Sequence, residues 1–177
     1  MRSSPFALGL VAALSLSAVA LPAVADTHLE IQGGRSYMDT HGTNVFFIES
    51  VFNPYQIGQS RFTWSPDVSV GYINGRNIQR YEFSQPGVTN NVWLGAAGAR
   101  FHYGTDSDWY QPLFFSFQVA GTAGGHTQAL SSSYQFVSTL GWQMKNVSFQ
   151  IRHISNGSFK EPNRGETMAL VGIGFNL

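Results

Sequence analysis

The feature that most constrains the fold is a two-residue alternation of apolar side chains near the C-terminus. Val147, Phe149 and Ile151 alternate with polar residues, and the apolar residues between positions 169 and 177 alternate mainly with glycine and asparagine. Because successive residues of an extended strand project to opposite faces, this period predicts strands with one apolar face and one polar or small face.

Strand-like stretches recur along the whole chain and are separated by short connections. They span Thr27 to Ser36, Asn44 to Phe52, Ser60 to Asn74, Asn91 to Tyr103, Gln111 to Gly121, Ser133 to Met144, Val147 to Asn156 and Thr167 to Asn176. Eight is the smallest strand number usual for an outer-membrane barrel. Pro66, inside the third stretch, predicts a bulge there because proline cannot donate to a strand ladder.

The composition distinguishes a membrane barrel from a soluble one. Charged residues make up 11% of the chain and aromatic residues 14%, whereas a soluble domain typically has about 25% charged residues. A soluble lipocalin-like barrel, which turns its apolar face inward, is the alternative. Low charge and the apolar C-terminal strand favour an all-β fold, an eight-stranded antiparallel transmembrane β-barrel of the outer membrane.

The N-terminus predicts export. A basic start at Met1-Arg2 is followed by an apolar run from Phe6 to Leu21 and by Ala23-Val24-Ala25, which is typical of a secretory signal peptide. We therefore expect a signal peptide at residues 1–25, one barrel domain at residues 26–177 and a location in the bacterial outer membrane. The chain has no cysteine and a formal net charge of zero, so thiolate metal sites are excluded and no nucleic-acid partner is expected.

The connections alternate in length, which predicts an orientation. With both termini periplasmic, the inner turns fall near Asn53 to Gln59, Gly104 to Tyr110 and Lys145-Asn146, and the external loops near Tyr37 to Thr43, Gly75 to Asn90, Thr122 to Ser132 and Gly157 to Glu166. The four tryptophans are candidates for aromatic girdles at the two membrane interfaces, with ordinary cross-strand packing as the alternative.

The candidate chemistry lies at the outer end of the seventh stretch. His153 and Ser155 are two residues apart, so they share the apolar, lipid-facing side of the strand. A serine hydroxyl becomes nucleophilic when a histidine takes its proton, and a third group must orient that histidine. Asn156 or nearby backbone N–H groups are candidates to stabilise an oxyanion. This combination predicts acyl transfer to water, at the level of outer-leaflet lipid.

The pattern His153-x-Ser155-Asn156, followed by Pro162-Asn163 and Gly165, resembles the PagL family of outer-membrane lipid A 3-O-deacylases. The resemblance implies an eight-stranded barrel with a His, Ser and Glu triad on its outer wall, which removes the 3-linked acyl chain of lipid A in lipopolysaccharide without a cofactor or metal. It also implies that Ser155 is the nucleophile, His153 the base and Asn156 an oxyanion contributor.

The third member of the triad is ambiguous. The glutamate of the family would fall two residues after Gly165, where this chain has Thr167, and Glu166 is one residue early. Alternation places Thr167 on the outer face and Glu166 on the inner one, but a bulge at the loop-to-strand junction would reverse this. Because threonine supplies no negative charge, we favour Glu166, followed by Thr167 as a neutral orienter and then Glu161.

Two other functions remain open at this point. The same residues also resemble outer-membrane phospholipase A, which has His-x-Ser-Asn-Gly and an asparagine as the third member of its triad. Its barrel has more strands, however, and its calcium dependence accompanies dimerisation. A non-enzymatic small barrel, an adhesin or an envelope stabiliser, is the alternative of a different class. Expected partners are lipid A and outer-membrane lipids, with a homodimer left open. Arg152, Lys160 and Arg164 are candidates to meet lipid phosphates.

Overall fold

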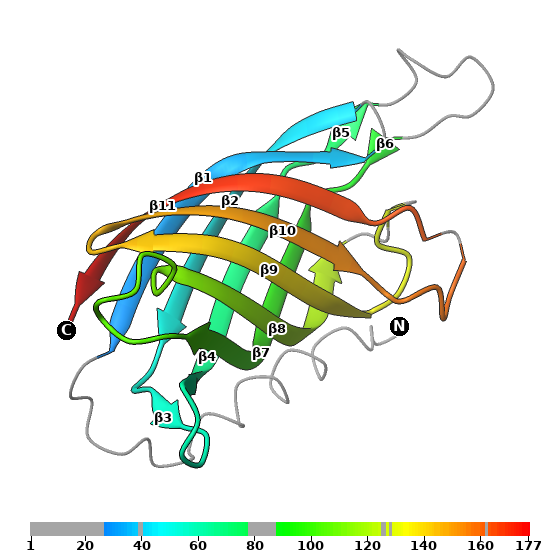
Figure 1. Cartoon of the computed structure of the whole chain (residues 1–177). Coiled ribbons are helices and arrows are strands. Elements are labelled where there is room, and N and C mark those ends of the chain that lie inside the picture. The colour runs from blue at the N-terminus through cyan, green and yellow to red at the C-terminus, as the bar shows by residue number, and fades with distance from the viewer. Residues whose placement is uncertain (1–26, 39–40, 78–87, 125–126, 128, 162) are drawn as a thin grey trace, which may run out of the picture.

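The computed structural model describes residues 27–38, 41–77, 88–124, 127, 129–161 and 163–177; the predicted signal peptide lies outside them. Within these residues, eight long antiparallel strands form a closed barrel (Figure 1). The strands are β1 (His28–Met38), β2 (His41–Val51), β4 (Phe62–Ile73), β7 (Val92–Tyr103), β8 (Leu113–Gly124), β9 (Tyr134–Met144), β10 (Val147–Ser155) and β11 (Glu166–Asn176). Consecutive long strands pair, and pairing of β1 with β11 closes the barrel. The expected fold is confirmed.

Three short strands extend the two ends. β3 (Tyr55–Gln56) pairs with β4 in the first inner turn, and β5 (Arg76–Asn77) pairs with β6 (Val88–Thr89) on the external side. β1 and β2 reach further outward than expected, since the ladder continues to Met38 opposite His41. Within the described residues, no helix is long and apolar enough to cross a membrane.

The barrel wall separates apolar and polar side chains as the alternation predicts. Val70, Leu140, Ile151 and Ile173 are more than half exposed on the outer face, whereas the interior holds buried glutamate, glutamine and arginine side chains together with an apolar cluster around Phe47. An apolar exterior around an interior rich in polar and charged groups is the arrangement of an outer-membrane barrel, and it is the reverse of a lipocalin-like barrel. The outer surface is therefore built to contact lipid.

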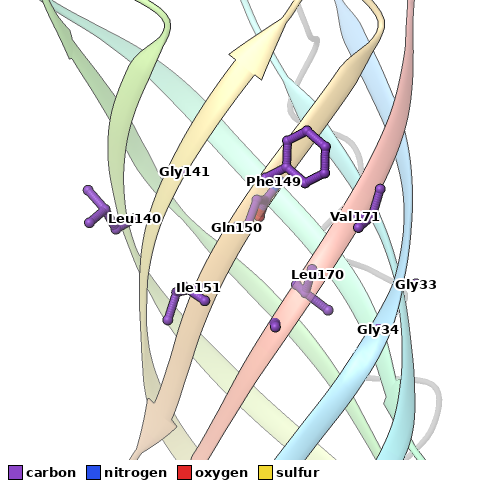
Figure 2. A pocket seen from close by; sticks show the side chains of 10 residues that line it. Gly33, Gly34, Leu140, Gly141, Phe149, Gln150, Ile151, Leu170 and Val171 are labelled. Carbon is purple, nitrogen blue, oxygen red and sulfur yellow. The ribbon is translucent and has the colours of Figure 1, made fainter. Parts of the chain in front are cut away.

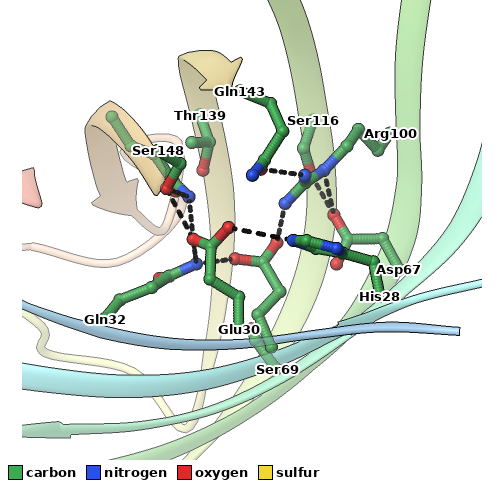
Figure 3. A network of polar contacts seen from close by, with 12 residues as sticks. His28, Glu30, Gln32, Asp67, Ser69, Arg100, Ser116, Thr139, Gln143 and Ser148 are labelled. Carbon is green, nitrogen blue, oxygen red and sulfur yellow. Dashed lines mark hydrogen bonds and ion pairs between the residues drawn. The ribbon is translucent and has the colours of Figure 1, made fainter. Parts of the chain in front are cut away.

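The interior is a network of ion pairs and hydrogen bonds, part of which is shown in Figure 3. Glu49 forms an ion pair with Arg100 at 3.1 Å and accepts a hydrogen bond from Arg152 at 2.7 Å. Glu30 accepts from Ser148 Oγ at 2.6 Å and from Gln150 Nε2 at 2.7 Å. Buried charges persist where they are paired and hydrogen-bonded, so this network ties strands on opposite walls together.

Phenylalanine rings support the two buried guanidinium groups. The Arg152 Cζ atom lies 4.5 Å from the centroid of the Phe47 ring, and the Arg100 Cζ atom lies 3.9 Å from that of Phe114. A Cβ atom at Gly141 would come within 2.3 Å of the Phe114 ring. Glycine at this position therefore makes room for an inward ring, on which an arginine stacks.

Pro66 does not create the bulge that the sequence predicted. The register of β4 with β7 runs without interruption through Pro66 opposite Ala99, and the pairing of β2 with β4 stops at Asp67. The Pro66 carbonyl oxygen accepts from Phe52 N at 3.0 Å, so this edge of the residue faces the end of β2. The nitrogen of Pro66, which has no hydrogen to donate, is on the same edge, beyond the last paired residue of the β2–β4 ladder. Proline is accommodated here without an extra residue.

Aromatic side chains gather toward both ends of the outer face. Tyr72 and Trp93 pack at 4.7 Å between ring centroids near the external end. Tyr55 and Trp64 pack at 5.2 Å at the inner end, where the Trp109 and Trp142 rings also stack, at 6.4 Å. These positions agree with aromatic girdles at the two interfaces.

The first prediction concerns the buried network. Arg152→Met should lower the free energy of unfolding by about 3 kcal/mol or more, because it leaves Glu49 buried with one of its two cations missing. Urea unfolding in lipid vesicles measures this. Arg61→Met, which removes an exposed pair with Asp108, is the control and should change stability little. Equal stability of Arg152→Met and the unaltered protein would show that the network does not hold the barrel together.

Candidate active site

The outer end of β10 carries the two residues proposed to react. His153 is exposed and Ser155 half-buried, and alternation places both on the outer face of the barrel. Residues two apart on a strand are about 7 Å apart along the chain, so the histidine ring must lean along the strand to reach the serine. Among the described residues, the side-chain hydrogen bond of His153 runs to Thr167 and not to Ser155.

Thr167 is the side chain that holds the histidine. His153 pairs with Thr167 across the β10–β11 ladder, and the distance from His153 Nδ1 to Thr167 Oγ1 is 2.9 Å. If Nδ1 carries the proton, the threonine oxygen accepts it, and Nε2 is left as the basic nitrogen. The hydrogen bond thus fixes the orientation of the ring in either tautomer.

Glu166 lies on the opposite side of the wall, which corrects the preference for it as the orienting acid. Its side chain is 3% exposed and accepts from Ser36 Oγ and from Arg76 inside the barrel. The ladder pairs Ile154 with Glu166 and His153 with Thr167, so no bulge reverses the parity at this junction. The Glu166 carboxylate is therefore turned away from His153. Glu161, the third candidate, accepts from Asn163 N at 3.0 Å in the adjoining loop.

Asn156 does not present its side chain to the outer wall, which corrects the expectation that its amide stabilises an oxyanion. The side chain is fully buried, and its Nδ2 atom donates to Lys160 O at 2.8 Å and to Ser131 Oγ at 3.2 Å. The backbone N–H of Asn156 donates to Asn163 Oδ1 at 3.3 Å. Asn156 thus shapes the loop between β10 and β11.

A second external segment braces that loop. Ala129 and Leu130 are almost completely buried at the barrel mouth. The Ala129 carbonyl oxygen accepts from Gly165 N at 3.2 Å, and Ser131 Oγ donates to Lys160 O at 3.0 Å. Sequence analysis treated these residues only as external loop. The signal that marks them is an apolar pair, Ala129-Leu130, within an otherwise polar segment.

Gly165 lies against the histidine ring. Its φ angle is +68°, and a Cβ atom at this position would lie 2.8 Å from His153 Cε1 and 3.1 Å from Nε2. A side chain is therefore excluded both by the left-handed backbone and by the imidazole. Gly165 leaves the ring the space it occupies beside Thr167.

The basic residues divide between the two sides of the wall. Arg152 is fully buried and paired with Glu49, so it is unable to meet a lipid phosphate, contrary to expectation. Lys160 and Arg164 are exposed in the loop beside the dyad. Arg35, which sequence analysis missed, is exposed on the outer face of β1, and its Nη1 atom donates to Asn44 Oδ1 at 3.1 Å.

Aromatic rings border the serine on its other side. Ser155 pairs with Phe136 of β9, whose ring lies 6.0 Å from that of Phe117 and 6.2 Å from that of Phe159. Phe159 projects from the loop and is 74% exposed. These rings give Ser155 an apolar border at the membrane interface.

The described residues contain no group of three or more histidine, cysteine, aspartate or glutamate side chains able to hold a metal ion. His28 contacts Asn176 at 2.7 Å and Glu30 at 3.6 Å near the inner end. His102 packs against the Phe114 ring at 5.8 Å between centroids. His126 lies outside the described residues.

The chain is similar to one protein family and to two solved structures described here. The family model described as "Lipid A 3-O-deacylase (PagL)" matches residues 19–176. The crystal structure of the outer membrane enzyme PagL is similar at 16% sequence identity, covering 85% of this chain and 99% of that one with a TM-score of 0.58. The structure of Ail, the attachment invasion locus protein of Yersinia pestis, in complex with sucrose octasulfate has 8% identity, covers 85% and 97%, and has a TM-score of 0.40. No curated protein sequence matches the chain.

The second prediction tests the space at Gly165. Gly165→Ala should lower esterase activity by about tenfold or more while the barrel still folds, because the new methyl group displaces the imidazole. Gly58→Ala is the matched control, since Gly58 has a φ of +59° with nothing within 4 Å of the added Cβ. Heat-modifiable gel migration reports folding and ester hydrolysis reports activity. If both variants lost activity equally, the loss would come from the strained left-handed backbone and not from contact with the imidazole.

The third prediction tests Thr167. Thr167→Val should lower kcat about 10- to 100-fold, because it removes one hydrogen bond to a histidine that becomes charged during the reaction. Such a hydrogen bond contributes about 1.5–3 kcal/mol. Thr167→Ser should retain activity because it keeps the hydroxyl. The measurement is steady-state hydrolysis of one lipid A substrate in detergent.

Glu166→Gln is the control for this prediction. It keeps hydrogen-bonding atoms for Ser36 and Arg76, so kcat should remain near that of the unaltered protein. Thr167→Glu, which places a carboxylate on the outer face beside His153, should raise kcat. A loss of about 10³-fold or more in Glu166→Gln with little loss in Thr167→Val would restore Glu166 as the orienting acid.

Proposed function

We propose, because this chain belongs to the PagL family of lipid A 3-O-deacylases, that it hydrolyses the ester of the 3-linked acyl chain of lipid A in the outer leaflet of the bacterial outer membrane. The observation that carries this proposal is the outward-facing His153, held by Thr167 at 2.9 Å next to Ser155 on a lipid-facing wall. Export by the signal peptide at residues 1–25 is part of the same proposal.

The position of the dyad supports a substrate that is a membrane lipid. On the membrane side of the dyad, Leu140 of β9, Ile151 of β10 and Val171 of β11 are apolar and exposed, and the external loops begin beyond Ser155. An ester at the boundary between sugar headgroup and hydrocarbon would meet the dyad without leaving the membrane. Lys160, Arg164 and Arg35 are exposed around it and suit the phosphates of lipid A.

In the proposed reaction, Ser155 Oγ attacks the carbonyl carbon of the ester as His153 Nε2 takes the hydroxyl proton. The tetrahedral intermediate collapses with release of the sugar oxygen, to which His153 returns the proton. Water then attacks the acyl-serine, with His153 again acting as base, and the free fatty acid leaves. Thr167 Oγ1 accepts from Nδ1–H and so orients the imidazole, and backbone N–H groups of the loop after Ser155 are the candidates for the oxyanion.

The proposed mechanism gives the buried Asn156 an indirect role in stabilising the oxyanion. Its amide joins Lys160 to Ser131, and so sets the path of the backbone immediately after the nucleophile. Backbone donors are effective only when they are rigidly aimed at the position of the developing charge. Asn156 is therefore proposed to act through the loop, as a positioning residue.

The fourth prediction tests the nucleophile. Ser155→Ala should lower deacylation by several orders of magnitude while leaving the barrel folded, because Ser155 Oγ bonds to no described residue. His153→Asn should have a similar effect. Mass spectrometry of lipid A from cells with and without each variant measures the loss of one 3-linked hydroxyacyl chain. Deacylation at the normal rate by purified Ser155→Ala would eliminate Ser155 as the nucleophile.

A further inference from the structure

An apolar groove opens on the outer wall at the end of the barrel opposite to the dyad, where β4 and β8 begin and β7 ends. Its volume is about 370 Å³. The outward-facing side chains that line it are Phe62, Phe101, Tyr103, Leu113, Phe115 and Leu140. Leu140, which Figure 2 shows projecting from the barrel wall, lies in one row with Phe115 and Phe101. The groove therefore runs along the strands from this row to the inner strand ends.

Aromatic rings close the inner end of the groove. Tyr103 packs on Phe62 at 4.6 Å between ring centroids and on Tyr110 at 6.0 Å. The next ring in the series, Trp109, lies 5.6 Å from that of Tyr110 and 6.4 Å from that of Trp142. Tyrosine and tryptophan side chains have an apolar body and a polar tip, so they are suited to the level of lipid headgroups.

One cation and one carboxylate lie beside these rings. The Arg61 Cζ atom is 5.5 Å from the centroid of the Tyr103 ring, and the Arg61 Nη2 atom forms an ion pair with Asp108. Within the described residues, the hydrogen bonds to the Asp108 side chain all use Oδ2; they come from Arg61 and from the Thr105 N and Oγ1 atoms, at 2.7 and 2.9 Å for the threonine. Asp108 Oδ1 is therefore left for a further donor, and a guanidinium has five N–H groups, of which this contact needs few.

A zwitterionic headgroup matches this pair of charges. Its phosphate would accept charge-assisted hydrogen bonds from Arg61. Its ammonium would donate to Asp108 Oδ1 and lie against the faces of the neighbouring tyrosine rings. A headgroup with a net negative charge would gain the contact with Arg61 but would be repelled by Asp108. A trimethylammonium group has no hydrogen to donate to the carboxylate, so a primary ammonium suits the site best.

We propose that this groove binds an aminophospholipid, a phospholipid with a primary ammonium in its headgroup, in the inner leaflet of the membrane. Its phosphate lies at Arg61 and its ammonium at Asp108, and one acyl chain occupies the groove as far as Leu140. Shielding the methylenes of that chain against the aromatic lining contributes to binding. The inference goes beyond the proposed function: it depends on the orientation that places the dyad in the outer leaflet, but not on the reaction at Ser155.

The fifth prediction concerns the choice of lipid. The purified protein in detergent should bind phosphatidylethanolamine about tenfold more tightly than phosphatidylglycerol or phosphatidylcholine with the same acyl chains, because only the first presents an ammonium that can donate to Asp108. Native mass spectrometry of the lipid-bound fraction measures this. Glycerophosphoethanolamine, which has the headgroup without acyl chains, should not displace the bound lipid. Equal binding of the three lipids would overturn the headgroup assignment, and displacement by the chain-free headgroup would overturn the role of the groove.

Two variants with matched controls test the charges. Arg61→Met should weaken binding of phosphatidylethanolamine about tenfold, whereas Lys145→Met, which removes an exposed cation from another inner turn, should not. Asp108→Asn keeps an acceptor for Thr105 but should remove the preference for phosphatidylethanolamine over phosphatidylglycerol. Asp106→Asn, which makes the same change at an exposed position of the same turn, should retain that preference.

Heat-modifiable gel migration shows that each variant is folded before its binding is compared. Normal binding of phosphatidylethanolamine by folded Arg61→Met, or an undiminished preference in folded Asp108→Asn, would refute the site. An equal loss in Lys145→Met and Arg61→Met would also refute it, because the lipid would then respond to the net charge of the inner end and not to a built pair.

Discussion

The continuous register between β10 and β11 is the constraint on which the site depends. Ile154 pairs with Glu166 and His153 with Thr167, with no extra residue on either strand. A shift of one residue would exchange every inward and outward side chain of β11. It would bring Glu166 to the lipid face, turn Thr167 into the interior and break the contacts of Glu166 with Ser36 and Arg76. Those interior contacts therefore help to hold the register that aligns the histidine with the threonine.

Parity and composition together predicted the barrel and the face that carries the candidate residues. Alternation at Val147, Phe149 and Ile151 indicated one apolar face shared by His153 and Ser155, and the low charge of the chain favoured that face as the outer one, as the structure has it. The same rule placed Glu166 inside, but the preference for a negative charge beside the histidine outweighed it. The rule was the better guide, because a bulge disrupts a ladder and here the ladder is intact at the junction.

The features of the site that the sequence did not predict depend on contacts between segments that are far apart in the chain. The burial of Asn156 follows from Ser131, which is 25 residues away in another loop. Gly33 and Gly34 are adjacent residues of the same type. A Cβ atom at Gly34 would meet the backbone of β11, whereas a Cβ atom at Gly33 would meet nothing within 4 Å. No pattern within a single strand distinguishes such positions. They emerge only when the pairing of β1 with β11 fixes which glycine faces outward.

A neutral partner for His153 is consistent with where the site lies. A carboxylate on the lipid-facing wall would carry a desolvation penalty in the resting enzyme unless a cation compensated it. The carboxylate of the adjacent Glu166 instead lies inside the barrel, where it pairs with Arg76. A threonine hydroxyl orients the histidine ring without that penalty. In the proposed mechanism it would stabilise a transient imidazolium less than an anion would, so the neutral partner favours compatibility with surrounding lipid over electrostatic stabilisation.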